Sequence, residues 1–311
     1  MKDITQKIKT LRKASACAIL KVSPEIIKLI NENKIPKGNP LEVAKVAAIQ
    51  AAKNTSQIIP YCHQLPIDFI GVDFELKEDC IEVTTNVKTL SKTGVEMEAL
   101  TAASIAVLTL YDMMKMLAEK MEITSVKLIS KKGGKSDFRQ YPKTSPKAAV
   151  LVMSDSVAAG TKDDESGQII IERLKNENVE VVDYKIIPDD LEEIKNTLKE
   201  YADNIKLDVV LTTGGTGFSP RDITPEAMKE IVEKEIPGIP EAMRSFGQER
   251  TPYSMLSRGK AGIRGKTLII NLPGSKNGVK DSLDVLFPGI FHSLKTIRGF
   301  NHDLKEKAGI K

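Results

Sequence analysis

Residues 209–217 read Val-Val-Leu-Thr-Thr-Gly-Gly-Thr-Gly, an apolar run that ends in a glycine-rich turn. Working outward from it, the second half of the chain contains four apolar runs, at 148–153, 179–187, 208–212 and 267–272. Stretches typical of helices separate or follow them, at 166–177, 190–202, 225–234 and 276–286. Strands that alternate with helices predict an α/β fold of three layers, with a parallel sheet covered on both faces.

Small or acidic residues follow each of these runs: Ser154-Asp155, Pro188-Asp189, Thr212 to Gly217, and Asn271 to Ser275. In a parallel sheet all four carboxyl ends fall at one edge, where open α/β folds bind ligands. The glycine turn lets backbone N–H groups approach an anion, although such glycines often form only a turn, and no Lys-Ser/Thr pair of a P-loop follows.

Two acids of this half, Asp189 and Asp222, are candidate ligands for magnesium held against nucleotide phosphates. The other interpretation is that both belong to ordinary helix starts. Thr224-Pro225 follows Asp222, and Asp190 follows Asp189. The residues alone leave both interpretations open.

The first half of the chain has a different spacing of apolar residues. Apolar residues alternate at 14–22, 72–76 and 81–87, which predicts strands, and the last two are joined as a hairpin through 77–79. Further elements are predicted helices at 41–53 and 95–120 and a short strand at 126–129. The order βαββαβ is that of an α+β, ferredoxin-like domain.

A segment rich in Gly, Pro, Ser and Lys separates the halves, over residues 131–137 and 141–146. Such a composition is typical of a linker. We therefore expect domains at 1–142 and 147–311.

The helix that contains Glu98, Asp112 and Lys115 is apolar almost all round, so the sequence predicts that it is buried. Asp112 and Lys115 lie three residues apart on one face, as either a structural ion pair or a proton-transfer pair. Glu98 lies fourteen residues earlier, about 21 Å along the axis, too far for one small substrate to touch both ends. A site shared between subunits, and thus a homo-oligomer, would bring the ends together.

Composition excludes several classes of function. The 311 residues carry a net charge of +4 with dispersed lysines, no Trp and 5% aromatic residues, unlike a nucleic-acid binder. No apolar run reaches the roughly 18 residues of a membrane span, and three cysteines without CxxC spacing indicate no disulfide framework. No strand is followed by GxGxxG, which excludes a dehydrogenase of the dinucleotide-binding type. We expect a soluble, cytoplasmic protein.

Residues 1–140 resemble the MoaC family. The motifs that carry this resemblance are Lys37-Gly38, Ile59-Pro60-Tyr61-Cys62-His63, Lys92 to Thr101, Tyr111-Asp112-Met113-Met114-Lys115 and Gly133 to Ser136. The resemblance implies conversion of a cyclic dihydroguanosine triphosphate into cyclic pyranopterin monophosphate with loss of pyrophosphate, and no cofactor.

The same resemblance assigns roles by position. Asp112 and Lys115 would be the acid–base pair. The implied substrate-binding residues are Lys37, Lys53 and His63 around the triphosphate, Met97 and Glu98 on the pterin side, and Tyr61 and Cys62. The chain departs from the family pattern at Pro36 and Asn39, where the family usually has His-Lys-Gly-Asp, and at Gln64, where it usually has Pro. These departures concern loops.

Residues 147–298 resemble the MoaB/Mog family, through Val209 to Gly217, Arg221 to Ala227, Ser257-Arg258, Ala261 to Gly265 and Leu268 to Gly274. The resemblance implies adenylylation of molybdopterin with ATP and Mg²⁺ in a domain that is usually trimeric, with Asp189 and Asp222 as the essential acids. The implied cradle consists of Ser154, Asp155, Thr213, Gly214, Gly215, Thr216, Gly217, Ser257, Pro273, Gly274 and Ser275.

One alternative comes from another class of function: a domain that only binds pterin, or serves assembly, without adenylyl transfer. With either function we expect a homo-oligomer, a trimer or hexamer, that binds small pterin and nucleotide molecules, with neither nucleic acid nor a membrane as partner.

Overall fold

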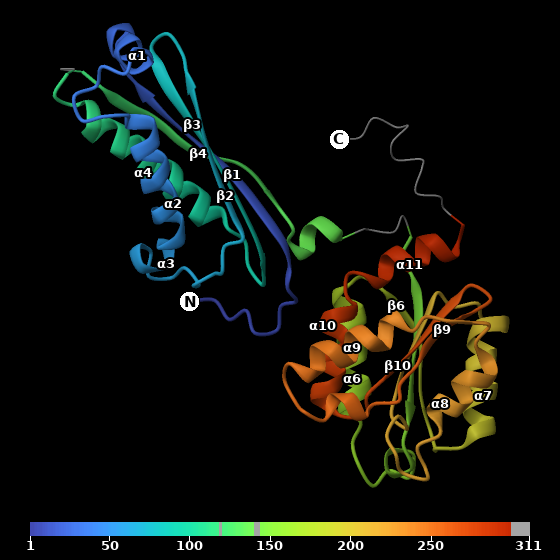
Figure 1. Cartoon of the computed structure of the whole chain (residues 1–311). Helices are drawn as coiled ribbons and strands as arrows, with labels where there is room; N and C mark the ends of the chain where they lie inside the picture. Colours follow the sequence, from blue (N-terminus) through green and yellow to red (C-terminus); the bar gives the residue numbers. More distant parts are fainter. Residues whose placement is uncertain (118–119, 140–143, 300–311) are drawn as a thin grey trace. The chain divides into compact units, whose positions relative to one another are not determined.

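The computed structural model describes residues 1–117, 120–139 and 144–299 and divides the chain into two compact units, Met1–Asp137 and Phe138–Lys311 (Figure 1). Residues 118 and 119 of the predicted helix and residues 141–143 of the predicted linker lie outside the described residues. The same holds for residues 300–311 of the predicted second domain.

The N-terminal unit is built on an antiparallel sheet in the order β2-β3-β1-β4. Its strands are β1 (Thr10–Lys21), β2 (Phe69–Leu76), β3 (Cys80–Ser91) and β4 (Glu122–Lys132). Ala14, Ala16 and Ala18 of the central strand β1 alternate into the core, as the period of two in the sequence requires. With the two main helices this is the ferredoxin-like arrangement that the sequence predicts.

Helices cover one face of this sheet. They are α1 (Pro24–Asn31), α2 (Pro40–Lys53), α3 (Thr55–Ile58) and α4 (Glu96–Met114), followed after β4 by the short 3-10 helix η1 (Lys135–Phe138). The main pair, α2 and α4, lie side by side on the sheet (Figure 1). Along α4 the fully buried residues Ala99, Ala102, Ala103 and Ala106 are small, which lets the helix approach the strands closely.

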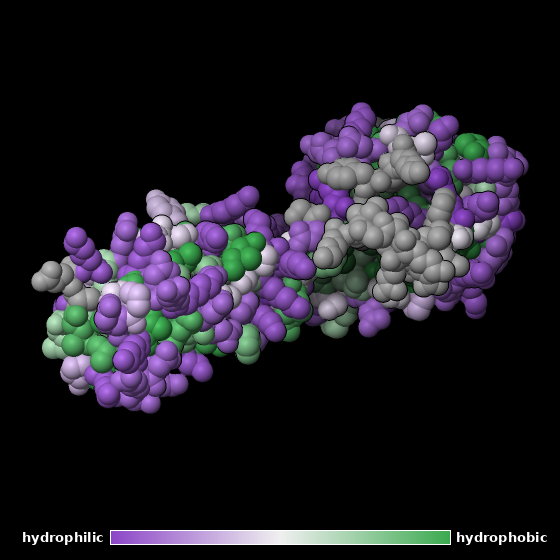
Figure 2. All heavy atoms as spheres, turned by 90° about the horizontal axis from the view of Figure 1, so that it is seen from above, coloured by the Kyte–Doolittle hydropathy of each residue, from purple (hydrophilic) through white to green (hydrophobic). Residues whose placement is uncertain are grey.

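Two expectations about α4 are wrong. The helix ends at Met114 rather than at residue 120, and it is not buried all round, because Leu108 and Tyr111 lie exposed on its outer side. Asp112 is exposed as well. Composition could not show which side faces water, since apolar residues occupy both. Figure 2 shows hydrophobic side chains at the surface of this unit among hydrophilic ones.

Two further findings concern α4 and β4. By length and composition α4 could cross a membrane, but 56% of the tested window is buried inside the unit, as in a core helix. Strand β4 continues through Lys132, so the start of the predicted linker is paired with β1 instead.

The C-terminal unit has a six-stranded sheet in the order β6-β5-β7-β10-β9-β8. Its strands are β5 (Lys147–Met153), β6 (Glu180–Ile187), β7 (Val209–Thr213), β8 (Lys234–Glu235), β9 (Ala261–Arg264) and β10 (Thr267–Leu272). The four predicted strands are mutually parallel, whereas β9 and β8 add an antiparallel edge. A tight turn with Gly265 at φ +57° returns the chain from β9 to β10, which forces antiparallel pairing there.

Helices on both faces make three layers (Figure 1). They are α5 (Asp155–Ala158), α6 (Glu165–Asn176), α7 (Leu191–Lys199) with the π-helical η2 (Glu200–Asn204), α8 (Thr224–Ile231), α9 (Gly238–Gln248), η3 (Ser254–Leu256), α10 (Lys276–Leu286) and α11 (Ile290–Ile297). Val150 and Val152 of β5 point into one core, and Leu151 and Met153 into the other. Burial on both faces explains why these strands are continuous apolar runs.

Candidate active sites

Three charged side chains meet at the C-terminal end of α4. Lys115 Nζ lies 2.8 Å from Asp112 Oδ1, and Lys37 Nζ lies 3.0 Å from Asp112 Oδ2. Lys37 Nζ also donates a hydrogen bond to the backbone carbonyl oxygen of Asp112 over 2.8 Å. Lys37 comes from the loop before α2, so the fold joins two segments 75 residues apart.

This cluster is open to solvent, with exposed fractions of 57% for Asp112 and 58% for Lys115. The hydrogen bonds from Lys115 and Lys37 lower the pKa of Asp112 to about 2. Asp112 in turn raises the pKa of Lys115. At neutral pH the cluster therefore holds two cations around one carboxylate, a net positive charge suited to an anion.

A second group gathers at the N-terminal end of the same helix. Glu98, in the first turn of α4, is only 4% exposed, and burial raises the pKa of its carboxyl. Burial also raises the pKa of the Cys62 thiol, and the nearby charge of Glu98 raises it further. Met97 beside them is 39% exposed. Along α4 this end is separated from Asp112 by fourteen residues, about 21 Å, so the two groups of residues lie at opposite ends of the helix.

The remaining predicted site residues of this unit are Lys53, Tyr61 and His63. Lys53 is the exposed last residue of α2, and Tyr61 is 78% exposed. His63 Nε2 donates a hydrogen bond to the backbone carbonyl oxygen of Lys2 over 2.8 Å, which ties the N-terminal segment to this loop. The structure does not bring His63 into hydrogen-bond contact with the Asp112 cluster among the described residues.

In the C-terminal unit the loops after the four parallel strands meet at one edge of the sheet, as predicted. They line a cavity of about 360 Å³. From the predicted site it contains Ser154, Asp189, Thr213, Gly214, Gly215, Asp222, Gly274 and Ser275, and from outside it Lys162, Asp163, Asp164 and Lys276.

Asp189 is the most unusual side chain of this cavity. Its Oδ1 is buried and has no hydrogen-bond partner among the described residues. Desolvation raises the pKa of Asp189, and the charges of Asp155 and Asp222 raise it further. A buried carboxylate oxygen without a partner is costly unless a proton or cation approaches it.

Asp222 is held by its surroundings. Its Oδ2 accepts a hydrogen bond from the backbone N–H of Ser219 over 2.7 Å, and Arg258 donates to its backbone carbonyl oxygen over 2.6 Å. Arg258 also donates to the carbonyl oxygen of Gly217 over 2.7 Å. One guanidinium therefore fixes both the end of the glycine turn and the backbone of the acid.

These oxygens fit a magnesium ion that also binds phosphate. No group of three His, Cys, Asp or Glu side chains placed to hold a metal occurs in the part of the chain that the structure describes. Mg²⁺ commonly takes one or two carboxylates and completes its shell with phosphate oxygens and water. The partnerless oxygen of Asp189 beside Asp222 is consistent with that donor set.

The glycine turn needs glycine for steric reasons. Gly214 has φ +101°, and a Cβ there would lie 2.0 Å from the carbonyl oxygen of Met153. Gly215 has φ +60°, and its Cβ would lie 2.4 Å from Thr224 Oγ1. Thr213 Oγ1 donates to the carbonyl oxygen of Pro273 over 2.7 Å, which joins this turn to the loop after β10.

Asp155 and Ser154 have local partners. The Arg221 guanidinium contacts both oxygens of Asp155 at 2.7–2.9 Å, and Asp155 Oδ1 accepts from the Asp189 backbone N–H over 3.1 Å. Ser154 caps the short helix α5 by accepting from Val157 N–H over 3.4 Å. These two residues shape the loop next to Asp189.

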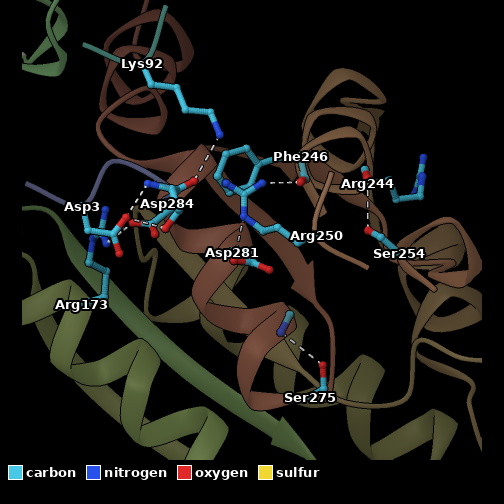
Figure 3. Close-up of polar contacts among 12 residues, drawn as sticks. Asp3, Lys92, Arg173, Arg244, Phe246, Arg250, Ser254, Ser275, Asp281 and Asp284 are labelled. Atoms are coloured by element: carbon cyan, nitrogen blue, oxygen red, sulfur yellow. Dashed lines mark hydrogen bonds and ion pairs between the residues drawn. The ribbon is translucent and has the colours of Figure 1, made fainter. Parts of the chain in front are cut away.

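A second, larger cavity of about 670 Å³ adjoins the first, because Ser275 and Lys276 line both. Ser257, Pro273 and Asp281 belong to the larger one. Its walls come from α9, η3 and α10, which Figure 3 shows around the side chains Arg244, Ser254, Arg250 and Asp281.

Comparison with known proteins agrees with the two-part architecture. Residues 1–134 match the family model of the MoaC family, and residues 149–292 match that of a probable molybdopterin binding domain. The chain is 42% identical over 97% of its length to the molybdenum cofactor biosynthesis bifunctional protein of Chlorobaculum tepidum, of which it covers 96%. The chain belongs to the bifunctional molybdenum cofactor biosynthesis proteins.

Relatives of the separate halves are also known. The N-terminal half is 48% identical to the cyclic pyranopterin monophosphate synthase of Aquifex aeolicus over 44% of this chain and 54% of that one. The C-terminal half aligns with the crystal structure of the molybdopterin biosynthesis enzyme MoaB from Thermus thermophilus at 42% identity and a TM-score of 0.48, covering 50% of this chain and 98% of that one.

Within this bifunctional family member, one departure from the MoaC pattern has a structural role. Asn39 is the N-cap of α2, and its Oδ1 accepts hydrogen bonds from the backbone N–H groups of Leu41 and Glu42 at 3.0 and 3.3 Å. Aspartate, which the family usually has there, would cap the helix in the same way. The change therefore removes a negative charge near Lys37 without removing the cap.

Sequence reasoning did not assign roles to Arg258 and Asp281 of this bifunctional protein. Arg258 belongs to the motif Ser257-Arg258, but its partners Gly217 and Glu226 are 41 and 32 residues away. Asp281 lies in a helix whose pattern looks ordinary. No local signal could have found the contacts of either residue, because they join segments that lie far apart in the sequence.

Proposed function

We propose that the N-terminal unit converts a cyclic dihydroguanosine triphosphate into cyclic pyranopterin monophosphate with loss of pyrophosphate. The Lys37–Asp112–Lys115 cluster is the observation that carries this proposal. Expulsion of pyrophosphate requires cations beside the leaving group and positioned proton donors and acceptors. The cluster offers both within about 3 Å of one carboxylate.

The chemistry assigns a task to each residue. Lys115 donates protons, and Asp112 accepts them. In the free enzyme Asp112 is a weak base, because the two lysines hold its pKa at about 2. When the triphosphate draws Lys37 and Lys115 toward its own oxygens, Asp112 loses their stabilisation and its pKa rises. Substrate binding therefore activates the base.

The two ends of α4 support a homo-oligomer. One substrate cannot bridge the roughly 21 Å between Glu98 and Asp112 of one subunit, so we propose that two subunits each contribute one end. Exposed apolar side chains on α4 and β4, namely Leu108, Tyr111, Val126 and Leu128, offer surface for such contacts. A trimer or hexamer follows if the C-terminal units associate around a threefold axis.

For the C-terminal unit we propose adenylylation of molybdopterin by ATP with Mg²⁺. The pterin's phosphate oxygen attacks the α-phosphorus, a new P–O bond forms, and pyrophosphate leaves. The partnerless Oδ1 of Asp189 is the observation that carries this proposal. Asp189 and Asp222 would hold Mg²⁺, which supplies positive charge against the phosphates.

The residues of the chain position the two substrates around these acids. Gly214 to Gly217 let phosphate approach the backbone, and Arg258 keeps that turn fixed. Ser257 and Pro273 line the adjoining cavity, where the pterin ring binds. Ser275 and Lys276 lie between the two cavities, where the phosphate of the pterin meets ATP.

One experiment separates adenylyl transfer from mere pterin binding. Full-length protein is incubated with molybdopterin, ATP and Mg²⁺, and AMP-linked pterin and pyrophosphate are measured. We expect both products only with Mg²⁺. Tight pterin binding without either product would identify the unit as a binding or assembly module. We also place the protein in the cytoplasm, which agrees with the free thiols of Cys17, Cys62 and Cys80.

A further inference from the structure

A carboxylate in the larger cavity has no role in the chemistry described so far. Asp281 lies in the second turn of α10, its side chain is only 15% exposed, and it lines the 670 Å³ cavity. Ser275, at the start of the same helix, belongs to both cavities. A molecule whose phosphate lies at Ser275 can therefore extend its ring toward Asp281.

Arg250 partly balances the charge of Asp281. Its Nε lies 3.4 Å from Asp281 Oδ1, while its guanidinium lies 3.2 Å from the Phe246 ring centre and donates to the Phe246 carbonyl oxygen over 2.6 Å (Figure 3). The separation from Asp281 exceeds a hydrogen bond of usual length. A carboxylate has about four acceptor positions, so Asp281 keeps acceptor capacity toward the cavity.

Because Asp281 is largely buried, leaving an acceptor position of its carboxylate without a hydrogen-bond donor costs free energy. Desolvation raises the pKa of Asp281, Arg250 lowers it, and Asp284 raises it. A ligand that offers two parallel N–H donors would replace the lost hydration with two charge-assisted hydrogen bonds. The cavity therefore selects for a planar ring with two adjacent donors on one edge.

We propose that Asp281 selects the pterin ring by accepting hydrogen bonds from its N3–H and its 2-amino group. This inference rests on the pterin-binding part of the proposed function and adds the residue that sets its specificity. Adenine presents one donor and one acceptor on its corresponding edge, so the base of ATP does not match the carboxylate. The larger cavity thereby distinguishes the two substrates.

The test compares two ring systems that differ at a single group. Lumazine carries a carbonyl oxygen where pterin carries the 2-amino group, so it sets an acceptor against the Asp281 carboxylate. Binding of 6-hydroxymethylpterin and 6-hydroxymethyllumazine to the full-length protein is measured by fluorescence. We expect wild type to prefer the pterin by roughly 10- to 100-fold, the usual effect of one mismatched buried polar group.

Asp281→Asn should strengthen the binding of lumazine relative to pterin. An asparagine amide offers one acceptor and one donor, which match the N3–H and 2-carbonyl of lumazine. We expect the preference to reverse. Asp284→Asn is the matched control, the same change three residues on in α10, and should keep the preference for pterin. Any binding by the N-terminal unit is common to all three proteins and cancels in the comparison.

The outcomes separate this inference from the proposed function. Equal affinity of wild type for both rings would overturn it, whether or not the variant folds. A folded Asp281→Asn that still prefers pterin, or that loses both rings, would also overturn it, even if AMP transfer is present. A reversed preference without AMP transfer would support the inference and refute the transferase. Guanosine shares the pterin edge, so tighter binding of guanosine than pterin would overturn the assignment to a pterin.

Discussion

Asp112 of the N-terminal unit and Asp189 of the C-terminal unit are both aspartates, but their surroundings are opposite. Asp112 is exposed and in contact with Lys37 and Lys115, which lower its pKa to about 2. Asp189 has a buried oxygen without a partner among the described residues, and desolvation raises its pKa. The first carboxylate is in contact with two cations, whereas the nearby cation Arg221 acts on the second only through its charge.

We propose that the difference reflects how each unit binds phosphate. In the N-terminal unit Lys37 and Lys115 already contact Asp112, so substrate binding would exchange one anion, Asp112, for another. In the C-terminal unit nearby acids Asp155 and Asp222 would repel both Asp189 and a nucleotide. That arrangement works when a metal ion arrives with the nucleotide. We therefore propose that the N-terminal reaction needs no metal ion and that the C-terminal reaction depends on Mg²⁺.

The largest effect is expected in the N-terminal unit. Asp112→Asn and Lys115→Ala each remove a proton-transfer group and should lower pyranopterin formation by roughly 10²–10⁴-fold. Both side chains are exposed, so the melting temperature should hardly change. Lys34→Ala, an exposed lysine paired with Glu32, is the matched control for charge. Near-normal turnover in either variant would make the pair structural.

In the C-terminal unit, Asp189→Asn and Asp222→Asn should each lower Mg²⁺-dependent AMP transfer by roughly 10²–10³-fold while leaving pyranopterin formation intact. Asparagine at 222 can still accept the hydrogen bond from Ser219, so the fold should persist. Asp190→Asn is the control, because Asp190 Oδ1 caps α7 by accepting a hydrogen bond from Glu193 N–H and the residue does not line the cavity. Full transfer in Asp222→Asn would mean that this acid serves the turn alone.

A smaller effect is expected from the glycine turn. Gly215→Ala should lower stability by about 1–3 kcal/mol, because the residue has positive φ and its Cβ would crowd Thr224 and Asp189. Gly160→Ala is the matched control, with φ +71° but nothing within 4 Å of the new Cβ. Thermal unfolding of both variants separates backbone strain from crowding. Equal losses would show that the close approach at Gly215 is unimportant.

The smallest effect concerns the boundary between the units. We propose that residues 1–142 and 147–311 are separate domains, so proteolysis near Lys143 should yield two folded fragments. Each fragment has its own buried core and should keep its own activity. Size-exclusion chromatography and the two activity assays check this. Aggregation of either fragment would place the boundary elsewhere.

The sequence alone predicts those features of the fold and of the candidate sites that depend on local patterns. Period-two alternation identified β1 and β3, and spacing of three identified the Asp112–Lys115 pair. The parallel runs also placed Asp189 and Gly214 at one edge, because strand ends alone fix that. Other features come from contacts between distant segments, which no local pattern encodes. They are the ion pair of Lys37 with Asp112, the hydrogen bond from Arg258 to Gly217, and the cavity around Asp281. The exposed side of α4 was missed because its outer face is apolar too.

The contrast between Asp112 and Asp189 can be measured directly by carboxyl ¹³C NMR of the full-length protein with labelled aspartate, between pH 3 and 7. Asp112 should stay ionised throughout, because its pKa is about 2. Asp189 should titrate above the ordinary value of 3.8 in metal-free protein. Its raised pKa adds stability at pH values below 3.8, and that stability is lost as the pH rises through the pKa of the folded state. Asp189→Asn should remove this loss.

Addition of Mg²⁺ with a non-hydrolysable ATP analogue decides the matter. We expect the Asp189 titration to move to lower pH, because a bound cation stabilises the carboxylate. An Asp189 titration that does not respond to Mg²⁺ and nucleotide would contradict the claim that this edge of the sheet is built for a cation.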